Sequence, residues 1–423
     1  MSDLKKKLKL LDKNKIKSSW ESINSGEGLT TREKLEKLVN VSLKKDKIIK
    51  KKKTERFDTD LPEYSILDFS YPLEDVYGKV KLEEWKEVSE NVLPTIFSDP
   101  GMKGIDPLKL LYFDTETTGL SGGTGTIPFM LGFGFFKEDL FKVKIFILND
   151  PDKEGEFLEV VDHFLNGNNF SGTVTYNGKT FDFPLMETRY ILNRKKFPLL
   201  KLPHLDFLFP ARTIWKNTFE SRRLGFLGDI LLGISRDDDV DGSLIPYLYF
   251  DYIRSGNFAL IEKVVEHNAL DIVGLSALLL LGCRYVDDPS FTEDEGEIFG
   301  VASLFERSGD FEEAEKLYGY FDGMNDRDDL VAKSVKRMAL LKKKNKLFGD
   351  ARDLWEKLSE FGDHIAIKEL SIHYEHKEKN FYSAIEFVRK GMELINITDN
   401  QRKDLEKRFE RLKKKISRIE KED

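Results

Sequence analysis

The sequence is poor in cysteine, in long apolar runs and in export signals. Its one cysteine among 423 residues, Cys283, excludes a disulfide framework and any zinc site built from cysteines. No apolar run reaches the roughly 18 residues of a membrane span, because the longest candidate, Ile272–Leu281, is interrupted by Gly274 and Ser276. The N-terminal residues MSDLKKKLKLLDKNK contain no apolar core of signal-peptide length. These absences predict a cytoplasmic protein that does not span a membrane.

Charged residues are abundant but unevenly distributed. The chain has 68 Lys and Arg against 75 Asp and Glu, a net charge of −7. Residues 1–57 hold 18 basic and 8 acidic residues, whereas the other 366 residues carry a net charge of −17. The basic run Lys44–Lys53 lies in a segment with few aromatic residues, which is typical of a disordered arm. The arm could contact phosphates through counterion release or serve only as a solvated tail, and both interpretations stay open.

Composition divides the rest of the chain into further segments. Residues 58–107 interleave prolines with aromatic residues, and we interpret them as an ordered lead-in that wraps the next domain. Within 108–286, the patterns predict strands at 108–113, 127–136, 141–148, 173–176 and 205–209, and helices at 152–166, 181–193 and 258–283. Strands that come first, followed by alternating elements, predict an α/β domain with a mixed sheet flanked by helices.

A short repeat indicates an all-α region over residues 295–420. The pattern Phe-x-x-Ala-x-x-Leu-aromatic around Ala314 recurs in similar form around Ala351 and Ala384, at spacings of 37 and 33 residues. This period is close to the roughly 34 residues of a tetratricopeptide repeat, so the pattern predicts a TPR-like helical solenoid that ends in a charged helix at Gln401–Glu420. Such a region could bind a protein partner or could act as a structural cap, and the pattern leaves both open.

Two acids stand at the end of the first apolar run. Asp114 and Glu116 follow Leu108–Phe113 and precede a glycine-rich loop, Gly119–Thr126. Residues i and i+2 of a strand face the same side, so both carboxylates can address one divalent cation such as Mg²⁺ or Mn²⁺. The loop could let a nucleotide approach the backbone closely, or could simply form a turn.

Three further residues complete a candidate catalytic set. Asp182 begins a predicted helix, where an acid favours the helix dipole and where a capping role is the plain alternative. His267 and Asp271 are four residues apart and therefore share one face of a largely apolar helix. Four acids in three segments can converge on two metal ions for a phosphodiester displacement, and His267 could act as general base on the attacking water.

These residues resemble a known class of enzymes. The patterns Asp114-x-Glu116, Asn177-x-x-x-Phe181-Asp182 and His267-x-x-x-Asp271 are similar to the three motifs of DEDD 3′–5′ exonucleases of the ribonuclease-H-like superfamily. The segment 108–285 resembles the YprB-type ribonuclease-H-like domain most closely. The resemblance implies a two-metal nuclease with Asp114, Glu116, Asp182 and Asp271 as metal ligands and a TPR-like tail that recruits a partner such as a helicase.

One spacing departs from that pattern. In the His-type enzymes the histidine lies five residues before the last aspartate, and in the Tyr-type enzymes a tyrosine lies four before; here a histidine occupies the four-residue spacing. A shift of one position on a helix rotates a side chain by about 100°. We therefore keep two interpretations of His267, as general base and as a packing residue of the closing helix.

A basic and aromatic group predicts the path of the nucleic acid. Arg212, Trp215, Lys216, Arg222 and Arg223 lie within twelve residues, and this mixture suits phosphate contacts and base stacking along a single strand. We also expect Thr117, Gly119 and Asn177, beside the acids, to contact nucleic acid. The resulting hypothesis is a 3′–5′ exonuclease acting on single-stranded DNA or RNA. A catalytically degenerate scaffold and a structure-selective endonuclease remain as alternatives.

Overall fold

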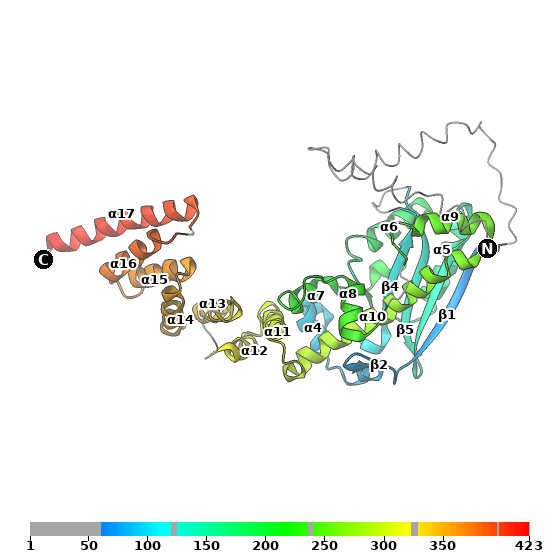
Figure 1. The fold of residues 1–423 in the computed structure, drawn as a ribbon, viewed down its shortest axis with the longest axis horizontal. Helices are drawn as coiled ribbons and strands as arrows, with labels where there is room; N and C mark the ends of the chain where they lie inside the picture. Colours follow the sequence, from blue (N-terminus) through cyan, green and yellow to red (C-terminus); the bar gives the residue numbers. More distant parts are fainter. Residues whose placement is uncertain (1–60, 120–124, 236–239, 323–328, 396, 423) are drawn as a thin grey trace, which may run out of the picture. The chain divides into compact units, whose positions relative to one another are not determined.

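The computed structural model describes residues 61–119, 125–235, 240–322, 329–395 and 397–422 (Figure 1). The basic arm expected at 1–57 lies outside the described residues, as does the centre of the glycine-rich loop at 120–124. Element labels are those of Figure 1.

A six-stranded mixed sheet forms the framework of the first part of the chain. Its strands are β1 (Tyr64–Pro72), β4 (Leu110–Thr117), β5 (Pro128–Lys137), β6 (Leu140–Leu148), β7 (Gly172–Thr175) and β8 (His204–Asp206). They lie in the order β1-β6-β5-β4-β7-β8. The first four strands pair antiparallel, whereas β7 and β8 run parallel to β4. The short strands β2 (Val76–Tyr77) and β3 (Val80–Lys81) pair separately. The predicted mixed sheet is confirmed.

Helices cover both faces of this sheet. The α-helices of this part are α4 (Val92–Phe97), α5 (Glu154–Asn166), α6 (Asp182–Leu192), α7 (Leu208–Ile214), α8 (Leu224–Leu232), α9 (Ile245–Ser255) and α10 (Glu262–Asp287). The alternation of β4 separates two cores. Leu110 and Tyr112 lie in the core that contains α10, and Leu111 and Phe113 lie in the core of α5 and α6. Both faces of β4 are therefore buried along the first half of the strand.

Short 3₁₀-helices connect these elements. They are η1 (Leu82–Glu87), η2 (Pro100–Met102), η3 (Pro107–Lys109), η4 (Pro151–Lys153), η5 (Pro198–Lys201), η6 (Phe258–Leu260), η7 (Pro289–Phe291) and η8 (Gly319–Phe321). Most begin with a proline, whose fixed φ and missing N–H suit the first turn of a helix.

The long helix α10 packs directly on the sheet. By length and composition it could cross a membrane, but 83% of its most apolar window is buried inside the protein, as in a core helix. Its close approach depends on Gly132 and Gly134 of β5. A Cβ atom built at Gly132 would overlap Asn268 and Ile272, and one at Gly134 would overlap Ile272 and approach Phe141. The two glycines therefore make room for one face of α10.

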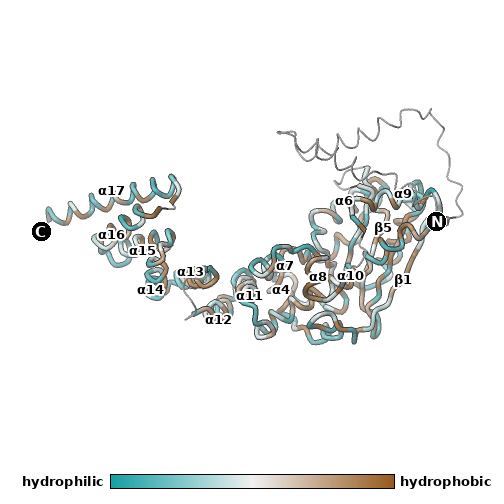
Figure 2. Tube along the Cα trace, in the orientation of Figure 1, coloured by the Kyte–Doolittle hydropathy of each residue, from teal (hydrophilic) through white to brown (hydrophobic). Residues whose placement is uncertain are grey.

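The chain continues as an all-α region. Its helices are α11 (Glu295–Ser308), α12 (Phe311–Tyr318), α13 (Asp329–Lys344), α14 (Phe348–Glu360), α15 (His364–His376), α16 (Phe381–Met392) and α17 (Asp399–Glu422). Consecutive helices pack as the pairs α11/α12, α13/α14 and α15/α16, and α17 packs on α16. Ala314, Ala351 and Ala384 are all buried, with exposed fractions of 0%, 3% and 0%. Figure 2 shows that α17 is hydrophilic over most of its length, and its buried contacts include Leu405 and Leu412.

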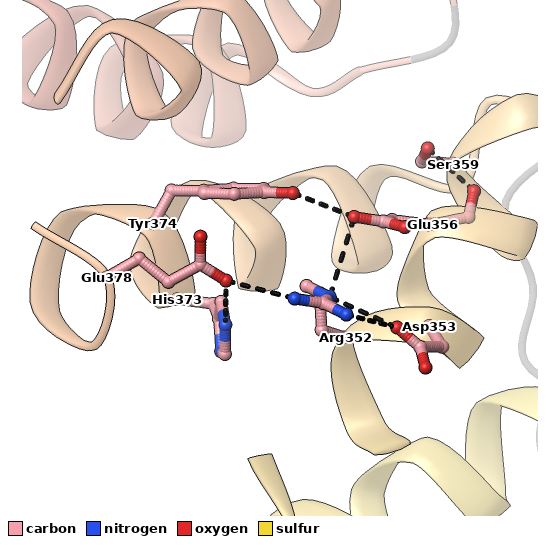
Figure 3. A network of polar contacts seen from close by, with 7 residues as sticks. All are labelled: Arg352, Asp353, Glu356, Ser359, His373, Tyr374 and Glu378. Carbon is pink, nitrogen blue, oxygen red and sulfur yellow. Dashed lines mark hydrogen bonds and ion pairs between the residues drawn. The ribbon is translucent and has the colours of Figure 1, made fainter. Parts of the chain in front are cut away.

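Polar contacts connect α14 with α15 and the turn after it (Figure 3). Arg352 Nη1 lies 3.2 Å from Glu378 Oε1, which also lies 2.9 Å from His373 Nε2. The Tyr374 hydroxyl donates to Glu356 Oε1 over 2.8 Å. Because such partly exposed pairs contribute little to stability, the apolar contacts around Ala351 and Trp355 carry more of the packing energy.

Two boundaries differ from the sequence-based expectation. Residues 64–72 of the expected lead-in form β1, which pairs with β6 over nine residues, so the described part of this segment, 61–107, belongs to the sheet domain. This partner lies far away in sequence, which explains why local composition suggested a separate segment. At the other end, α11 packs against α7 and α4 of the sheet domain. The first helix of the all-α region is therefore packed into the sheet domain.

Candidate active site

Asp114 and Glu116 lie inside β4 rather than after it. The strand runs to Thr117, with its first four residues buried and its last four half-buried. Asp114 is paired across the sheet with Gly132, and the register shifts between Glu116 and Thr117. The two carboxylates therefore stand where the buried strand opens toward solvent, on the face that α10 covers.

The surroundings of Asp114 are electrostatically unfavourable for its charged form. Burial raises the pKa of the Asp114 carboxyl well above its usual range, and repulsion from Asp182, Asp271 and Glu116 raises it further. A hydrogen bond from the Thr115 backbone acts in the opposite direction. Four acids from three separate elements thus lie within electrostatic reach of one another, which is the condition for holding a divalent cation.

Asp182 is the first residue of α6 and is 9% exposed. The Thr115 hydroxyl donates to its Oδ1 over 2.5 Å. Burial, with repulsion from Asp206, raises the pKa of Asp182 to about 6, although the hydrogen bond from Thr115 and one from its own backbone lower it. Thr115 lies between the two acids of β4, and its hydroxyl connects this strand to the start of α6.

A buried aspartate shapes the loop that leads to Asp182. Asp206, which is 1% exposed, accepts the backbone N–H of Asn177 over 2.7 Å and that of Lys179 over 3.0 Å. Asn177 has a φ of +71°, in the left-handed region that asparagine tolerates better than most residues. The loop is thereby fixed before α6 starts, which sets the position of Asp182.

The N-terminal half of α10 supplies the remaining groups. His267 Nε2 lies 3.0 Å from Asp271 Oδ2, as the four-residue spacing predicts for one helix face. Asn268, which is 0% exposed, donates from Nδ2 to Asp114 Oδ2 over 2.7 Å. Helix α10 therefore contacts Asp114 of β4 through the Asn268 amide, which belongs to the residue that follows His267.

Sequence reasoning missed Thr115, Asn268 and Asp206 as members of this site. Thr115 and Asn268 stand within motifs that were recognised, and Asp206 stands within the predicted strand 205–209. No spacing pattern marks a hydroxyl, an amide or a single buried acid as part of a site. The available signal was position: Thr115 separates the two acids of β4, and Asn268 follows His267 directly.

The donor set fits hard divalent cations by its chemistry. Carboxylate oxygens are the ligands that Mg²⁺ and Mn²⁺ prefer, and the mutual repulsion at Asp114 would be relieved by a cation. Within the described ranges, no three Asp, Glu, His or Cys side chains form a ready-made metal cage. Instead, Asp114, Asp182 and Asp271 each contact a protein group, namely Asn268, Thr115 and His267. The four acids therefore fit a divalent cation by their charge and by the type of ligand atom that they offer.

Most of the expected nucleic-acid contacts lie near this site or at the surface. The Thr117 hydroxyl donates to the Gly119 carbonyl over 2.8 Å. Arg212, Lys216 and Arg223 are exposed. Arg222 is half-buried, and its Nη1 donates to the backbone carbonyls of Phe219 and Glu220. The exposed cations remain available for phosphate contacts.

The expectation for Trp215 was wrong. This side chain is 0% exposed, and its Nε1 donates to Glu297 Oε1 over 2.9 Å. A buried indole cannot stack on a nucleic-acid base. The sequence pattern of basic residues around a tryptophan suggested a binding surface, but the tryptophan faces the interior and joins α7 to α11.

Comparisons with known proteins agree with this architecture. Residues 111–281, which include all five candidate catalytic residues, match the family described as the RNase_H superfamily. The fold and the match define a ribonuclease-H-like nuclease domain, whose substrate class is nucleic acid. The chain is also 31% identical over 371 residues to an uncharacterized protein, YprB, of Bacillus subtilis (strain 168), and the match covers 84% of this chain and 87% of the relative. The chain belongs to the YprB family.

Proposed function

We propose that the protein is a metal-dependent 3′–5′ exonuclease that hydrolyses phosphodiesters at single-stranded DNA or RNA ends. The observation that carries this proposal is the concentration of four acids around Asp114. Two other buried acids are neutralised by cations: Glu154 pairs with Arg189 over 2.6 Å, and Glu375 contacts Arg408 and Arg411. Buried Asp206 and Glu297 instead accept hydrogen bonds from neutral groups. Among the described residues, Asp114 and Asp182 form no ion pair with a lysine or arginine and accept from the Asn268 amide and the Thr115 hydroxyl instead, which fits a site kept for external metal.

The four acids have the role of metal ligands in this proposal. Asp114, Glu116, Asp182 and Asp271 would hold two Mg²⁺ or Mn²⁺ ions. Bound ions of this kind activate the attacking water and stabilise the departing oxygen of a phosphodiester. Thr115 and the loop fixed by Asp206 orient Asp182, so the protein supplies the position of its ligands before a substrate arrives.

His267 is the proposed general base, and its surroundings limit how it can act. Its Nε2 is held by Asp271. The imidazole can therefore accept a proton at Nδ1, or at Nε2 once the contact with Asp271 opens. A role in packing α10 is the alternative, and the rate of a His267 variant separates the two.

The proposed substrate path uses half-buried groups beside the acids together with exposed cations. Thr117, Gly119 and Asn177 adjoin the acids, and Arg212, Lys216 and Arg223 supply positive charge for the phosphates. We further propose that the protein acts in the cytoplasm and that its TPR-like helical region binds a protein partner, for which the family resemblance suggests a helicase.

A catalytically degenerate nucleic-acid-binding scaffold is the second candidate. It is favoured by the fact that the described residues form no ready-made metal cage, and by the contact that holds His267 to Asp271. A scaffold would bind nucleic acid and leave it intact.

One assay separates these functions. Single-stranded DNA and RNA oligonucleotides, labelled at either end, are incubated with the protein and Mg²⁺, Mn²⁺ or EDTA. The proposal predicts stepwise shortening from the 3′ end that EDTA stops. Cleavage of a circular single strand would indicate an endonuclease, and binding without cleavage of either nucleic acid would indicate the scaffold.

A further inference from the structure

Asn268 stands out because it is fully buried and contacts a proposed metal ligand. Its Nδ2 donates to Asp114 Oδ2 over 2.7 Å, from the residue next to His267. We propose that Asn268 is a positioning residue, which holds the Asp114 carboxylate in the orientation that binds metal. The inference rests on the proposed function, because it concerns how a metal ligand of that site is oriented.

The space for this contact is built into the sheet. Asp114 pairs with Gly132 on the neighbouring strand β5. A Cβ atom at Gly132 would overlap the Asn268 side-chain oxygen. The amide thus occupies the place that a side chain of β5 would otherwise take, immediately beside Asp114. The contact therefore depends on three elements. Strand β5 supplies the space at Gly132, helix α10 supplies Asn268, and strand β4 supplies Asp114.

The hydrogen bonds of the Asn268 side chain do not suit a purely structural role. Its Oδ1 is buried and accepts no hydrogen bond from any described residue. Leaving a buried acceptor unsatisfied is unfavourable, so stability alone would favour an apolar side chain here. The arrangement keeps the asparagine nonetheless, and the one contact it gains is the donation to Asp114.

An amide is also suited to this task by its charge. A lysine or arginine in the same place would neutralise Asp114 and compete with a bound cation. An amide donates a hydrogen bond and leaves the negative charge available. Outer hydrogen bonds of this kind orient metal ligands, and their loss typically weakens metal affinity about 10–100-fold.

The first test compares two asparagines that both donate to a carboxylate. Asn268→Asp keeps the size of the side chain and replaces the donor to Asp114 with a carboxylate. Because added negative charge by itself strengthens cation binding, a loss of Mn²⁺ affinity in this variant reports the lost orientation of Asp114. Asn193→Asp makes the same change at a half-buried residue whose Nδ2 donates to Glu154 Oε2 over 2.8 Å, outside the candidate site. Mn²⁺ binding to the full-length protein is measured by isothermal titration calorimetry in the absence of nucleic acid. We expect about 10–100-fold weaker binding for Asn268→Asp and wild-type binding for Asn193→Asp.

The second test changes no polar residue. In Gly132→Ala the new Cβ displaces the Asn268 amide, whereas in Gly134→Ala the new Cβ meets Ile272 and Phe141 instead. Both variants crowd α10, and their thermal midpoints show whether the crowding is comparable. The inference predicts that Gly132→Ala loses more Mn²⁺ affinity than Gly134→Ala. This pair also covers the case in which Asn268→Asp fails to fold.

The outcomes separate the inference from the function on which it rests. Equal losses of Mn²⁺ affinity in Gly132→Ala and Gly134→Ala, at comparable thermal midpoints, would overturn the positioning role. Absence of Mn²⁺ binding by the wild-type protein itself would instead overturn the proposed function. Weaker binding for Asn268→Asp and Gly132→Ala alone would support the inference.

Discussion

Two buried acids, Glu375 and Asp182, have pKa values that are shifted in opposite directions. Burial by itself would raise the pKa of Glu375, but hydrogen bonds from Arg411 and Lys415 lower it to about 2. Asp182 is nearly as buried, and its side-chain donor is the hydroxyl of Thr115. Its pKa is accordingly raised to about 6. The protein stabilises one acid for its own structure and leaves the other electrostatically strained.

This contrast predicts opposite dependences of stability on pH. The folded-state pKa of Asp182 is raised, so between about pH 4 and 6 the folded protein binds a proton that the unfolded chain does not, and stability falls as pH rises. Asp182→Asn removes this effect. We expect its metal-free form to gain about 1–3 kcal/mol in unfolding free energy at pH 7, and a smaller gain at pH 4, by urea unfolding.

Glu375→Gln is the control of opposite sign. Because the folded-state pKa of Glu375 is lowered, its contribution is present above the unfolded-state pKa and is lost as pH falls toward 2. The variant should lose about 1–3 kcal/mol at pH 7 and less at pH 3. The same pH trend in both variants would contradict the distinction between the two acids.

His267 allows a kinetic prediction. If it accepts the proton of the attacking water, His267→Ala should lower kcat by about 10²–10⁴-fold and remove the acid limb of the pH–rate profile. His163→Ala, at an exposed position of α5, is the matched control and should keep the wild-type rate. A change of less than threefold, with the profile intact, would assign His267 to packing.

At the level of elements, apolar runs predicted the central strands well and their polar ends poorly. The expected strand 108–113 proved to run from Leu110 to Thr117, because pairing with β5 continues after the side chains become polar. The pairing of β1 with β6 could not be predicted, since it joins segments about 75 residues apart. Trp215 and Asn268 show the same limit at the site: composition does not reveal which way a side chain faces.

The helix pairs of the C-terminal region give a packing prediction. Ala351 of α14 is 3% exposed, so Ala351→Leu inserts volume into a filled contact and should destabilise the protein by about 1–3 kcal/mol. Gly349→Ala on the same helix is the control, because no atom lies within 4 Å of its new Cβ. Thermal unfolding of both variants is the measurement. Equal thermal unfolding midpoints for Ala351→Leu and Gly349→Ala would show that Ala351 does not lie at a tightly packed helix contact.

At the level of the whole molecule, the sheet domain and the all-α region share a buried connection. Trp215, which directly follows α7, donates to Glu297 of α11, and Thr292 donates to the other oxygen of the same carboxylate. Gly300 lets α11 lie directly against the backbone of Ile214, where a Cβ would overlap it. The first helix after the sheet domain is therefore anchored by both a polar contact and a close backbone approach.

This connection can be tested through Trp215. Trp215→Phe keeps an aromatic ring and removes the donor, which leaves Glu297 Oε1 without its partner. We expect a loss of about 1–3 kcal/mol in stability and no change in affinity for a single-stranded oligonucleotide. Fluorescence anisotropy of a labelled oligonucleotide measures the affinity. A loss of binding at unchanged stability would restore the stacking role that the structure argues against.

The proposed nuclease activity depends on metal ions held by the acids around Asp114. The most direct measurement compares the wild type with Asp114→Asn, purified identically, for cleavage of a single-stranded oligonucleotide with Mn²⁺. Asp162→Asn, in a residue of α5 that accepts from the Tyr190 hydroxyl over 2.7 Å, is the matched control. We expect Asp114→Asn to lose at least about a thousandfold in rate, with its fold and oligonucleotide affinity retained, and Asp162→Asn to match the wild type. Equal cleavage by Asp114→Asn and the wild type would contradict the account.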